Sequence, residues 1–157
     1  MCIRDSNTPY DCLPGSGLFW ADSFVPGGAL IEGPEIVQHR EYYYLFFAAG
    51  KFCQDSYSEG VARSRSIFGP YTKLGVPLLS TGMVGYAVTS PDAGDGQEQV
   101  GVAKLVGPGH GSFVQDQTTS DWFVVYHASR GENCGRYSFI DRLAFGSDGW
   151  PRVNFVS

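Results

Sequence analysis

The sequence predicts an all-β protein built from short antiparallel strands, and three features of its composition lead to that prediction. Its 157 residues include 21 Gly and 9 Pro, which favour tight turns over long helices. Aromatic residues make up 15% of the chain, and charged residues make up only 17%, below the roughly 25% of an average soluble domain. A helix bundle would be rich in Ala, Leu, Glu and Lys, and a disordered chain would be poor in aromatic residues. Short aromatic segments separated by Gly and Pro are typical of β-sheet proteins.

The first group of expected strands lies between residues 32 and 74. Its segments are aromatic or β-branched, and turn-forming or charged residues separate each one from the next. They are Ile36–Gln38, Tyr42–Ala48, Ser58–Ser64 and Tyr71–Leu74. Because Gly33-Pro34 comes just before the first segment, we expect a tight turn there.

A second group of expected strands follows Ser90–Gln99, a polar stretch that we expect to form a surface loop. Its segments are Ser112–Val114, Trp122–Ala128, Tyr137–Phe145 and Pro151–Phe155. The two groups resemble each other, since Glu41–Ala48 aligns with Asp121–Ala128 and a Gly-Pro pair precedes each segment. A strand-rich unit that recurs over this distance indicates propeller blades, each a small antiparallel sheet. A β-sandwich remains open at this point.

Charge and cysteine content exclude several classes of function. The net charge is −5 and no basic stripe is present, which argues against nucleic acid or an anionic membrane surface as a partner. The longest apolar run, Tyr42–Gly50, is too short for a membrane-spanning helix. The four cysteines are widely spaced, without a CxxC pair, so a zinc ribbon is not expected. The sequence leaves open whether Cys53 and Cys134 pair in an oxidising compartment.

The amino-terminal region differs from the rest of the chain. Met1–Ser6 lacks the apolar core of a signal peptide and resembles an adapter-derived run at the start of an assembled read, so we expect it to be a sequence artefact. Residues 7–29 are rich in Gly and Pro and are expected to form loop or part of an upstream segment. Residues 30–157 hold both strand groups and are expected to form the blades.

Two positions combine chemistry-bearing side chains with a special local context. Glu32 lies between apolar residues and a glycine-proline pair, and a carboxyl group that is partly shielded from water suits a general acid. His110 lies in the glycine-rich run Gly107–Ser112, whose small residues leave the imidazole uncovered for a substrate or a metal. His127 at the end of one expected strand and Arg136 before the next could reach the same end of the sheet, where they could bind sugar hydroxyls. Glu35 and Glu41 are expected to be ordinary surface carboxylates.

Taken in order, these segments resemble glycoside hydrolase family 43. The resemblance covers residues 30–155 and rests on an ordered set of motifs rather than on one triplet. In the first group the motifs are Ile31–Pro34, Tyr42–Phe47, Tyr57–Ser64 and Gly69–Tyr71; in the second they are Gly107–Ser112, Trp122–His127, Arg136, Ile140–Leu143 and Asp148–Pro151.

The resemblance implies a five-bladed β-propeller, of which this chain would supply about the last two blades. Family members hydrolyse arabinose- or xylose-containing polysaccharides or oligosaccharides with inversion. By motif matching, Glu32 would be the general acid, His110 would lie near a central metal such as Ca²⁺ and bind it through water, and Arg136 would contact the sugar. Tyr57 and His127 join His110 and Arg136 as expected substrate-binding residues. A polymeric substrate implies secretion, and the full-length protein is expected to be a monomer.

The sequence departs from the family pattern in its catalytic aspartates. The family's Asp base and the Asp that tunes the acid lie well upstream of the Glu-Gly-Pro motif. Asp11 and Asp22 are the upstream candidates here, and both fall in a Gly/Pro-rich segment too close to Glu32. We therefore expect an amino-terminally truncated glycosidase that is inactive alone. The alternatives are a non-catalytic carbohydrate-binding propeller module and a β-sandwich with no sugar function.

Overall fold

The computed structural model describes residues 31–88, 101–130 and 134–154, and the elements that it assigns within these ranges are ten β-strands. The described residues contain no helix long and apolar enough to cross a membrane. The expected artefact at Met1–Ser6, the segment 7–29 with its two aspartates, and the expected loop Ser90–Gln99 lie outside the described residues.

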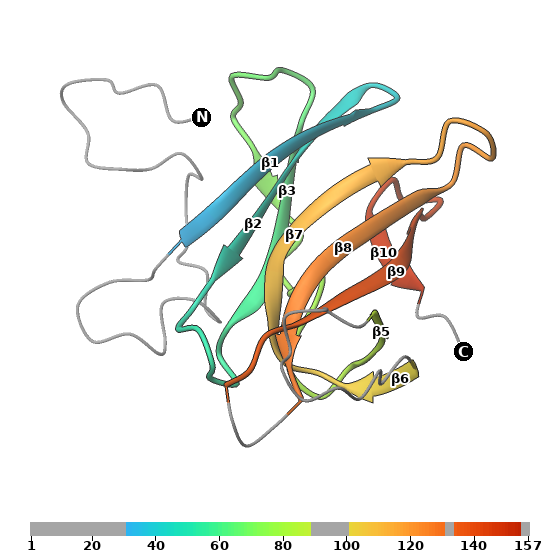
Figure 1. Ribbon diagram of the computed structural model, residues 1–157. Helices are drawn as coiled ribbons and strands as arrows, with labels where there is room; N and C mark the ends of the chain where they lie inside the picture. The colour runs from blue at the N-terminus through green and yellow to red at the C-terminus, as the bar shows by residue number, and fades with distance from the viewer. Residues whose placement is uncertain (1–30, 89–100, 131–133, 155–157) are drawn as a thin grey trace, which may run out of the picture.

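The first sheet is a four-stranded antiparallel meander that follows chain order. It comprises β1 (Ile31–His39), β2 (Tyr42–Ala49), β3 (Ser58–Ser64) and β4 (Thr72–Lys73), each hydrogen-bonded to the next (Figure 1). A tight turn joins β1 to β2: His39 pairs with Tyr42, and Arg40 between them has φ +53°. This arrangement is the expected first blade.

The second sheet repeats this meander and adds a hairpin. It comprises β7 (Val106–Gln115), β8 (Trp122–Ser129), β9 (Tyr137–Phe145) and β10 (Pro151–Asn154) in antiparallel order. The hairpin of β5 (Val84–Val88) and β6 (Gly101–Lys104) joins the start of β9, and β10 pairs with the end of β9. Strand β8 begins and ends 80 residues after β2, so the repeat seen in the sequence corresponds to equivalent strands.

The structure corrects several expected strand limits. The Gly33-Pro34 pair, expected to form a turn before a short strand, lies inside β1 at a register shift between Glu32 and Glu35. The glycine-rich run before Ser112 likewise belongs to β7, which carries two such shifts. Bulges accommodate Gly and Pro within a ladder, so both strands extend past these residues. In addition, β4 is shorter than Tyr71–Leu74, and the hairpin of β5 and β6 was not expected.

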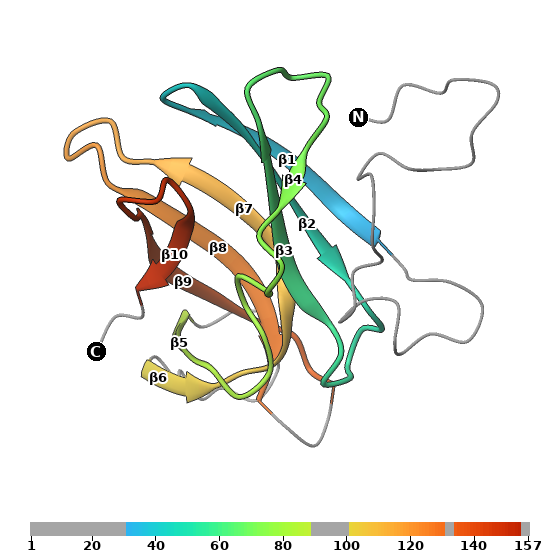
Figure 2. The same cartoon turned by 180° about the vertical axis from the view of Figure 1, so that it is seen from behind.

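The core lies between the two sheets, where β7 packs against β1, β2 and β3 (Figure 2). The rings of Phe46 on β2 and Phe113 on β7 stack with centroids 3.6 Å apart. Strand β2 is buried on both faces, because Tyr44 and Phe46 face this core whereas Leu45 and Phe47 belong to a second apolar cluster. A strand covered on both faces suits a sheet stacked between neighbours in a propeller.

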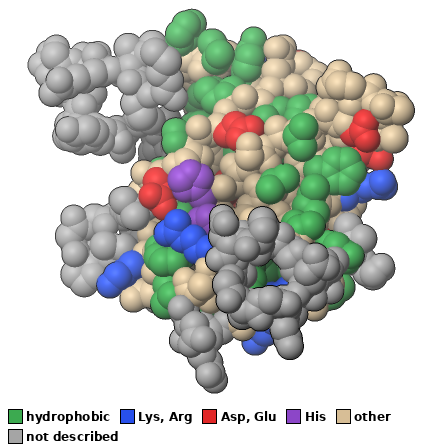
Figure 3. Space-filling model, viewed as in Figure 1, with side chains coloured by type: hydrophobic (Ala, Val, Ile, Leu, Met, Phe, Trp, Pro, Cys, Tyr) green, Lys and Arg blue, Asp and Glu red, His purple; other side chains and the backbone are tan. Residues whose placement is uncertain are grey.

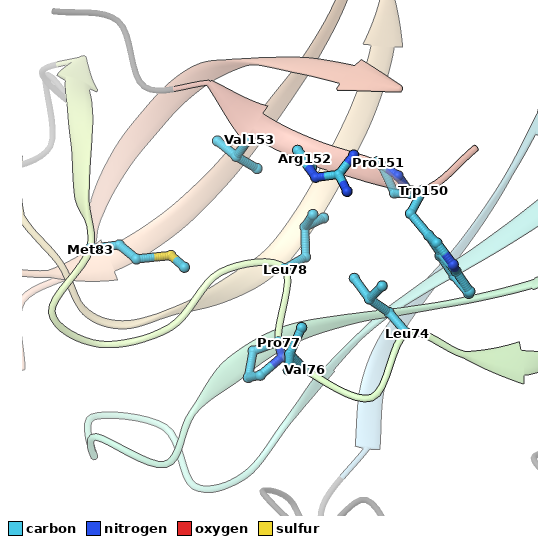
Figure 4. A pocket seen from close by; sticks show the side chains of 9 residues that line it. All are labelled: Leu74, Val76, Pro77, Leu78, Met83, Trp150, Pro151, Arg152 and Val153. Carbon is cyan, nitrogen blue, oxygen red and sulfur yellow. The ribbon is translucent and has the colours of Figure 1, made fainter. Parts of the chain in front are cut away.

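An apolar hollow of about 280 Å³ lies between the segment after β4 and the strand β10 (Figure 4). It is lined by Leu74, Val76, Pro77, Leu78, Met83, Trp150, Pro151, Arg152 and Val153. Its charged member, Arg152, is paired with Asp148 at 2.7 Å. Its lining comes from the segment after β4 and from the region of β10, so it lies where the two sheets meet. None of the predicted site residues lines it.

Candidate active site

Glu32 lies at the bulge of β1, where two predicted site residues meet it. The Tyr57 hydroxyl donates a hydrogen bond to Glu32 Oε1 at 2.7 Å, and His110 Nδ1 lies 4.0 Å from the same oxygen. The side chains of His110 and Glu32 are 53% and 38% exposed, so both are accessible to a ligand. Gly33 permits this approach, because it has φ +58° and a Cβ there would lie 2.8 Å from the His110 ring.

Tyr57, just before β3, supports Glu32 from within the core. Its side chain is fully buried, and burial is the first cause that raises the pKa of its hydroxyl, followed by the hydrogen bond to Glu32. The hydroxyl therefore stays protonated at neutral pH and remains a donor to the carboxylate. Its ring lies against Gly109, where a Cβ would come within 2.6 Å of Tyr57 Cε1.

His110 is presented by the second bulge of β7. It has φ +55°, and the residues between Gly109 and Ser112 are out of register with β8. The side chain of Glu59 on β3 accepts the Gly111 N–H at 3.1 Å. Glu59 is fully buried, and burial raises its pKa to about 8, although the backbone N–H groups of Gly111 and His110 act in the opposite direction. Sequence reasoning missed Glu59, although a carboxylate within the otherwise small and apolar Ser58–Ala62 run was the available signal.

His127 and Arg136 complete the cluster from the second sheet. The His127 ring stacks on Tyr57 with centroids 5.7 Å apart and lies 6.1 Å from the His110 ring. Burial, followed by the positive charge of Arg136, lowers the pKa of His127 to about 4, so its imidazole is neutral at pH 7. The Arg136 guanidinium lies 3.8 Å above the ring of Phe52, a residue that sequence reasoning also missed.

The five predicted site residues are therefore brought together from both sheets. They are Glu32, Tyr57, His110, His127 and Arg136. Figure 3 shows histidine side chains at the surface between an acidic and a basic group. A disulfide between Cys53 and Cys134, with Cα atoms 5.3 Å apart, joins the loop before β3 to the segment before β9 beside this cluster.

Among the described residues, the expected calcium ion has no complete set of protein ligands. The described residues hold no group of three or more His, Cys, Asp or Glu side chains that could bind one metal ion. Calcium prefers six to eight oxygen ligands, whereas the site offers one carboxylate beside a histidine. The metal role of His110 stays a prediction.

Glu35 is more than a surface carboxylate. It accepts hydrogen bonds from Ser112 Oγ and from the Phe113 N–H, both at 3.0 Å, and so joins β1 to β7. This contact, together with the core packing of β7, connects the strand that carries Glu32 to the strand that carries His110. Glu41 is exposed, as expected.

The described part of the site offers a defined set of chemical groups. It has one carboxylate whose Oε1 is held by Tyr57, and among the described residues no donor occupies Oε2. A neutral imidazole, an exposed imidazole and a guanidinium surround it, and aromatic rings form its floor. Such a set can donate a proton and bind hydroxyl groups, but the described residues bring no second exposed carboxylate into it to activate water, since Glu59 is fully buried.

Comparison with known proteins identifies what the chain resembles. The family model of glycosyl hydrolases family 43 matches residues 12–151. The chain is 30% identical over 137 residues to the "Extracellular exo-alpha-(1->5)-L-arabinofuranosidase ArbA" of Cellvibrio japonicus strain Ueda107, which covers 85% of this chain and 36% of that protein. A crystal structure of a thermostable family-43 glycoside hydrolase superposes with a TM-score of 0.64 at 29% identity, over 92% of this chain and 40% of that one. The crystal structure of a xylan beta-1,4-xylosidase from Bacillus halodurans C-125 superposes with a TM-score of 0.57 at 30% identity, over 79% of this chain and 22% of that one.

The match covers most of this chain but only part of each relative. The chain spans 22% to 36% of the length of four curated relatives that it matches. Three findings point to the same family over the described strands: the ordered motifs, the antiparallel meanders and the family model. The chain belongs to glycosyl hydrolases family 43.

Proposed function

We propose that this chain supplies the general acid and part of the sugar-binding pocket of an inverting glycosidase that acts on arabinose- or xylose-containing polysaccharides or oligosaccharides. The observation that carries the proposal is Glu32, a partly exposed carboxyl group anchored by the buried Tyr57 hydroxyl and flanked by His110. The names of its relatives, which include an arabinofuranosidase, arabinanases and a xylosidase, support the substrate class.

In the proposed reaction, Glu32 donates its proton to the glycosidic oxygen while water attacks the anomeric carbon from the opposite face. Inverting enzymes place the acid and the base roughly 6.5–9.5 Å apart so that water fits between them. Tyr57 fixes the orientation of the Glu32 carboxyl group, and His110 and Arg136 bind sugar hydroxyls. The base must come from outside the described residues, and we predict that the 157-residue chain alone does not hydrolyse glycosides.

The role of Glu32 can be tested through the leaving group. In the longer enzyme encoded by the full open reading frame, Glu32→Gln should lower kcat on arabinan or xylan about 10²- to 10⁴-fold, because a sugar alcohol needs a proton to depart. A dinitrophenolate leaving group needs little protonation, so kcat on an aryl glycoside that carries it should fall far less in this variant. Glu41→Gln, which replaces an exposed carboxylate on the same β-hairpin, is the matched control and should leave both rates unchanged.

Two outcomes would contradict the proposal. An equal loss of rate on both substrates would mean that Glu32 is not the acid. Hydrolysis of an aryl arabinoside by the 157-residue chain, abolished by Glu32→Gln, would show that a base is present after all.

A second candidate function is a carbohydrate-binding propeller module without catalysis. It is favoured by one observation: within the described residues, the cluster of predicted site residues contains a single carboxylate. A longer enzyme that binds arabino- or xylo-oligosaccharides but hydrolyses none of them would support this alternative.

We infer that the protein acts outside the cell, as a monomer. Three curated relatives are named extracellular, and the disulfide between Cys53 and Cys134 suits an oxidising compartment. Sedimentation of the secreted full-length protein would test the monomer, and a dimer would refute it.

A further inference from the structure

Arg136 has a feature that its role as a sugar-contacting residue does not explain. Its guanidinium is exposed and, among the described residues, forms no ion pair. Its close contact is instead the face of Phe52, at 3.8 Å from the ring centroid. A long, exposed Arg side chain samples many rotamers, so its place beside the cluster needs a physical cause.

Phe52 is itself held in the cluster. Its ring lies edge-on to Tyr57 and to His127, with centroids 6.4 Å and 6.1 Å apart. The Phe52 ring therefore rests on two buried or half-buried aromatic groups and offers its face to the cation. The turn that carries Phe52 is closed by hydrogen bonds from Gln54 N–H to the Lys51 carbonyl and from Tyr57 N–H to the Gln54 carbonyl.

The disulfide ties the other side of this contact. Cys53 directly follows Phe52, and Cys134 comes two residues before Arg136, so the bond joins the segment that carries the ring to the segment that carries the cation. The two segments belong to different sheets and are 81 residues apart in sequence. A cation–π contact at an exposed site is weak, whereas a covalent tether gives the two groups a high effective concentration.

We propose that Phe52 and the Cys53–Cys134 disulfide are positioning elements that hold the Arg136 guanidinium over the Tyr57 and His127 end of the candidate site. The use of Arg136 on a sugar rests on the proposed function, whereas its positioning does not. The ring supplies the surface on which the guanidinium lies, and the disulfide keeps the two chain segments in register.

Nuclear magnetic resonance of the 157-residue chain tests the positioning directly. Protons held over an aromatic face are shifted upfield, so the Arg136 Nε–H and Hδ signals should lie upfield of those of Arg142, which pairs with Asp121 instead. Phe52→Leu should abolish the shift, and Phe52→Tyr, which keeps the ring, should preserve it. The double variant Cys53→Ser, Cys134→Ser should reduce the shift toward that of Arg142.

Arg63 provides the internal control. Its guanidinium lies 4.0 Å above the Trp150 ring, a contact that involves neither Phe52 nor the disulfide, so its signals should not change in any of these variants. An unchanged Arg136 shift in Phe52→Leu would overturn the proposal. A full shift in a folded double cysteine variant would overturn the role of the disulfide, and Phe52→Leu still decides the role of the ring if the cysteine variant fails to fold.

Sugar binding separates this inference from the proposed function. The same variants are titrated with an arabino-oligosaccharide. Each variant that loses the Arg136 shift should bind it with a Kd about two- to fivefold higher than that of the wild type. An unchanged Kd together with a lost shift would leave the positioning standing and refute Arg136 as a sugar contact.

Discussion

At the scale of single residues, Glu59 makes a prediction about stability and pH. Burial raises its pKa in the folded protein from 4.5 to about 8, so the folded state holds a proton that the unfolded chain releases between these values. The favourable contribution is therefore present below pH 4.5 and is lost as the pH rises through about 8. The shift corresponds to a loss on the order of 5 kcal/mol, taken as an upper value.

Glu59→Gln should remove this dependence, because the amide keeps an acceptor for the Gly111 N–H and cannot ionise. Urea unfolding at pH 5, 7 and 9 should show that the wild type loses more stability toward pH 9 than the variant does. Glu41→Gln, at an exposed position, should follow the wild type. Equal losses in wild type and Glu59→Gln would show that Glu59 is ionised in the folded state throughout this range.

His127 makes a second prediction at this scale. Its pKa of about 4 has burial as its first cause and the charge of Arg136 as its second. Arg136→Gln should therefore raise the pKa of His127 but leave it below 6.5, since the burial remains. Titration of the imidazole by nuclear magnetic resonance measures this change. The control is Arg142→Gln, which removes a cation paired with Asp121 and should leave the pKa of His127 unchanged. If the pKa of His127 in Arg136→Gln equals that of the wild type, the Arg136 guanidinium does not lie near His127.

At the scale of elements, the strands that could be predicted are those whose pattern is local. Tyr42–Ala48 was expected and β2 spans Tyr42–Ala49, because an aromatic run between turn signals is a strong strand pattern. Strand β7 was expected only as Ser112–Val114, since its first half consists of turn-forming residues. That half joins the sheet by pairing with β8 and by a contact distant in sequence, the hydrogen bond from the Gly111 N–H to the Glu59 carboxyl group.

The same reasoning separates what could be predicted of the site from what could not. Glu32, His110 and Arg136 were expected from family motifs, whereas Phe52 and Glu59 act through contacts with segments more than 50 residues away. Nothing in the local sequence of Phe52 indicates that Arg136 lies on its ring. The short β5 and β6 were missed because Val84–Val88 and Gly101–Lys104 become strands only by pairing with each other and with β9.

Gly109 on β7 carries a prediction for this element. In Gly109→Ala the new Cβ would lie 2.6 Å from Tyr57 Cε1, and Tyr57 is fully buried and cannot move aside freely. We expect a loss of about 1–3 kcal/mol in the free energy of unfolding, measured in urea, together with a displaced Tyr57 and a weaker bond to Glu32. Gly135→Ala is the matched control, because its Cβ would meet Tyr137 at an ordinary 3.6 Å. A wild-type stability in Gly109→Ala would show that β7 does not press on Tyr57.

At the scale of the whole molecule, the two sheets share one core and should unfold together. The main apolar cluster takes residues from both sheets, and the Phe46–Phe113 stack lies where they meet. The Tyr44 hydroxyl also donates to the Gly149 carbonyl, and the Arg63 side chain donates to the Asp148 carbonyl at 2.8 Å, so the turn before β10 is bonded to the first sheet. The candidate site has residues on both sheets and therefore depends on this interface.

Phe113→Ala tests that dependence. Removing a ring that is 7% exposed and stacked on Phe46 should lower the free energy of unfolding by about 3–5 kcal/mol, because a cavity opens between the sheets. The neighbouring Val114→Ala, at a side chain that is 51% exposed on the other face of β7, should change stability by no more than about 0.5 kcal/mol. In urea, circular dichroism of the strands and the upfield Arg136 signal should be lost in one shared transition, in the wild type and at a lower midpoint in Phe113→Ala. Two separate transitions in the wild type would mean that each sheet is stable alone, and the site would then be assembled by docking of preformed blades rather than by one cooperative fold.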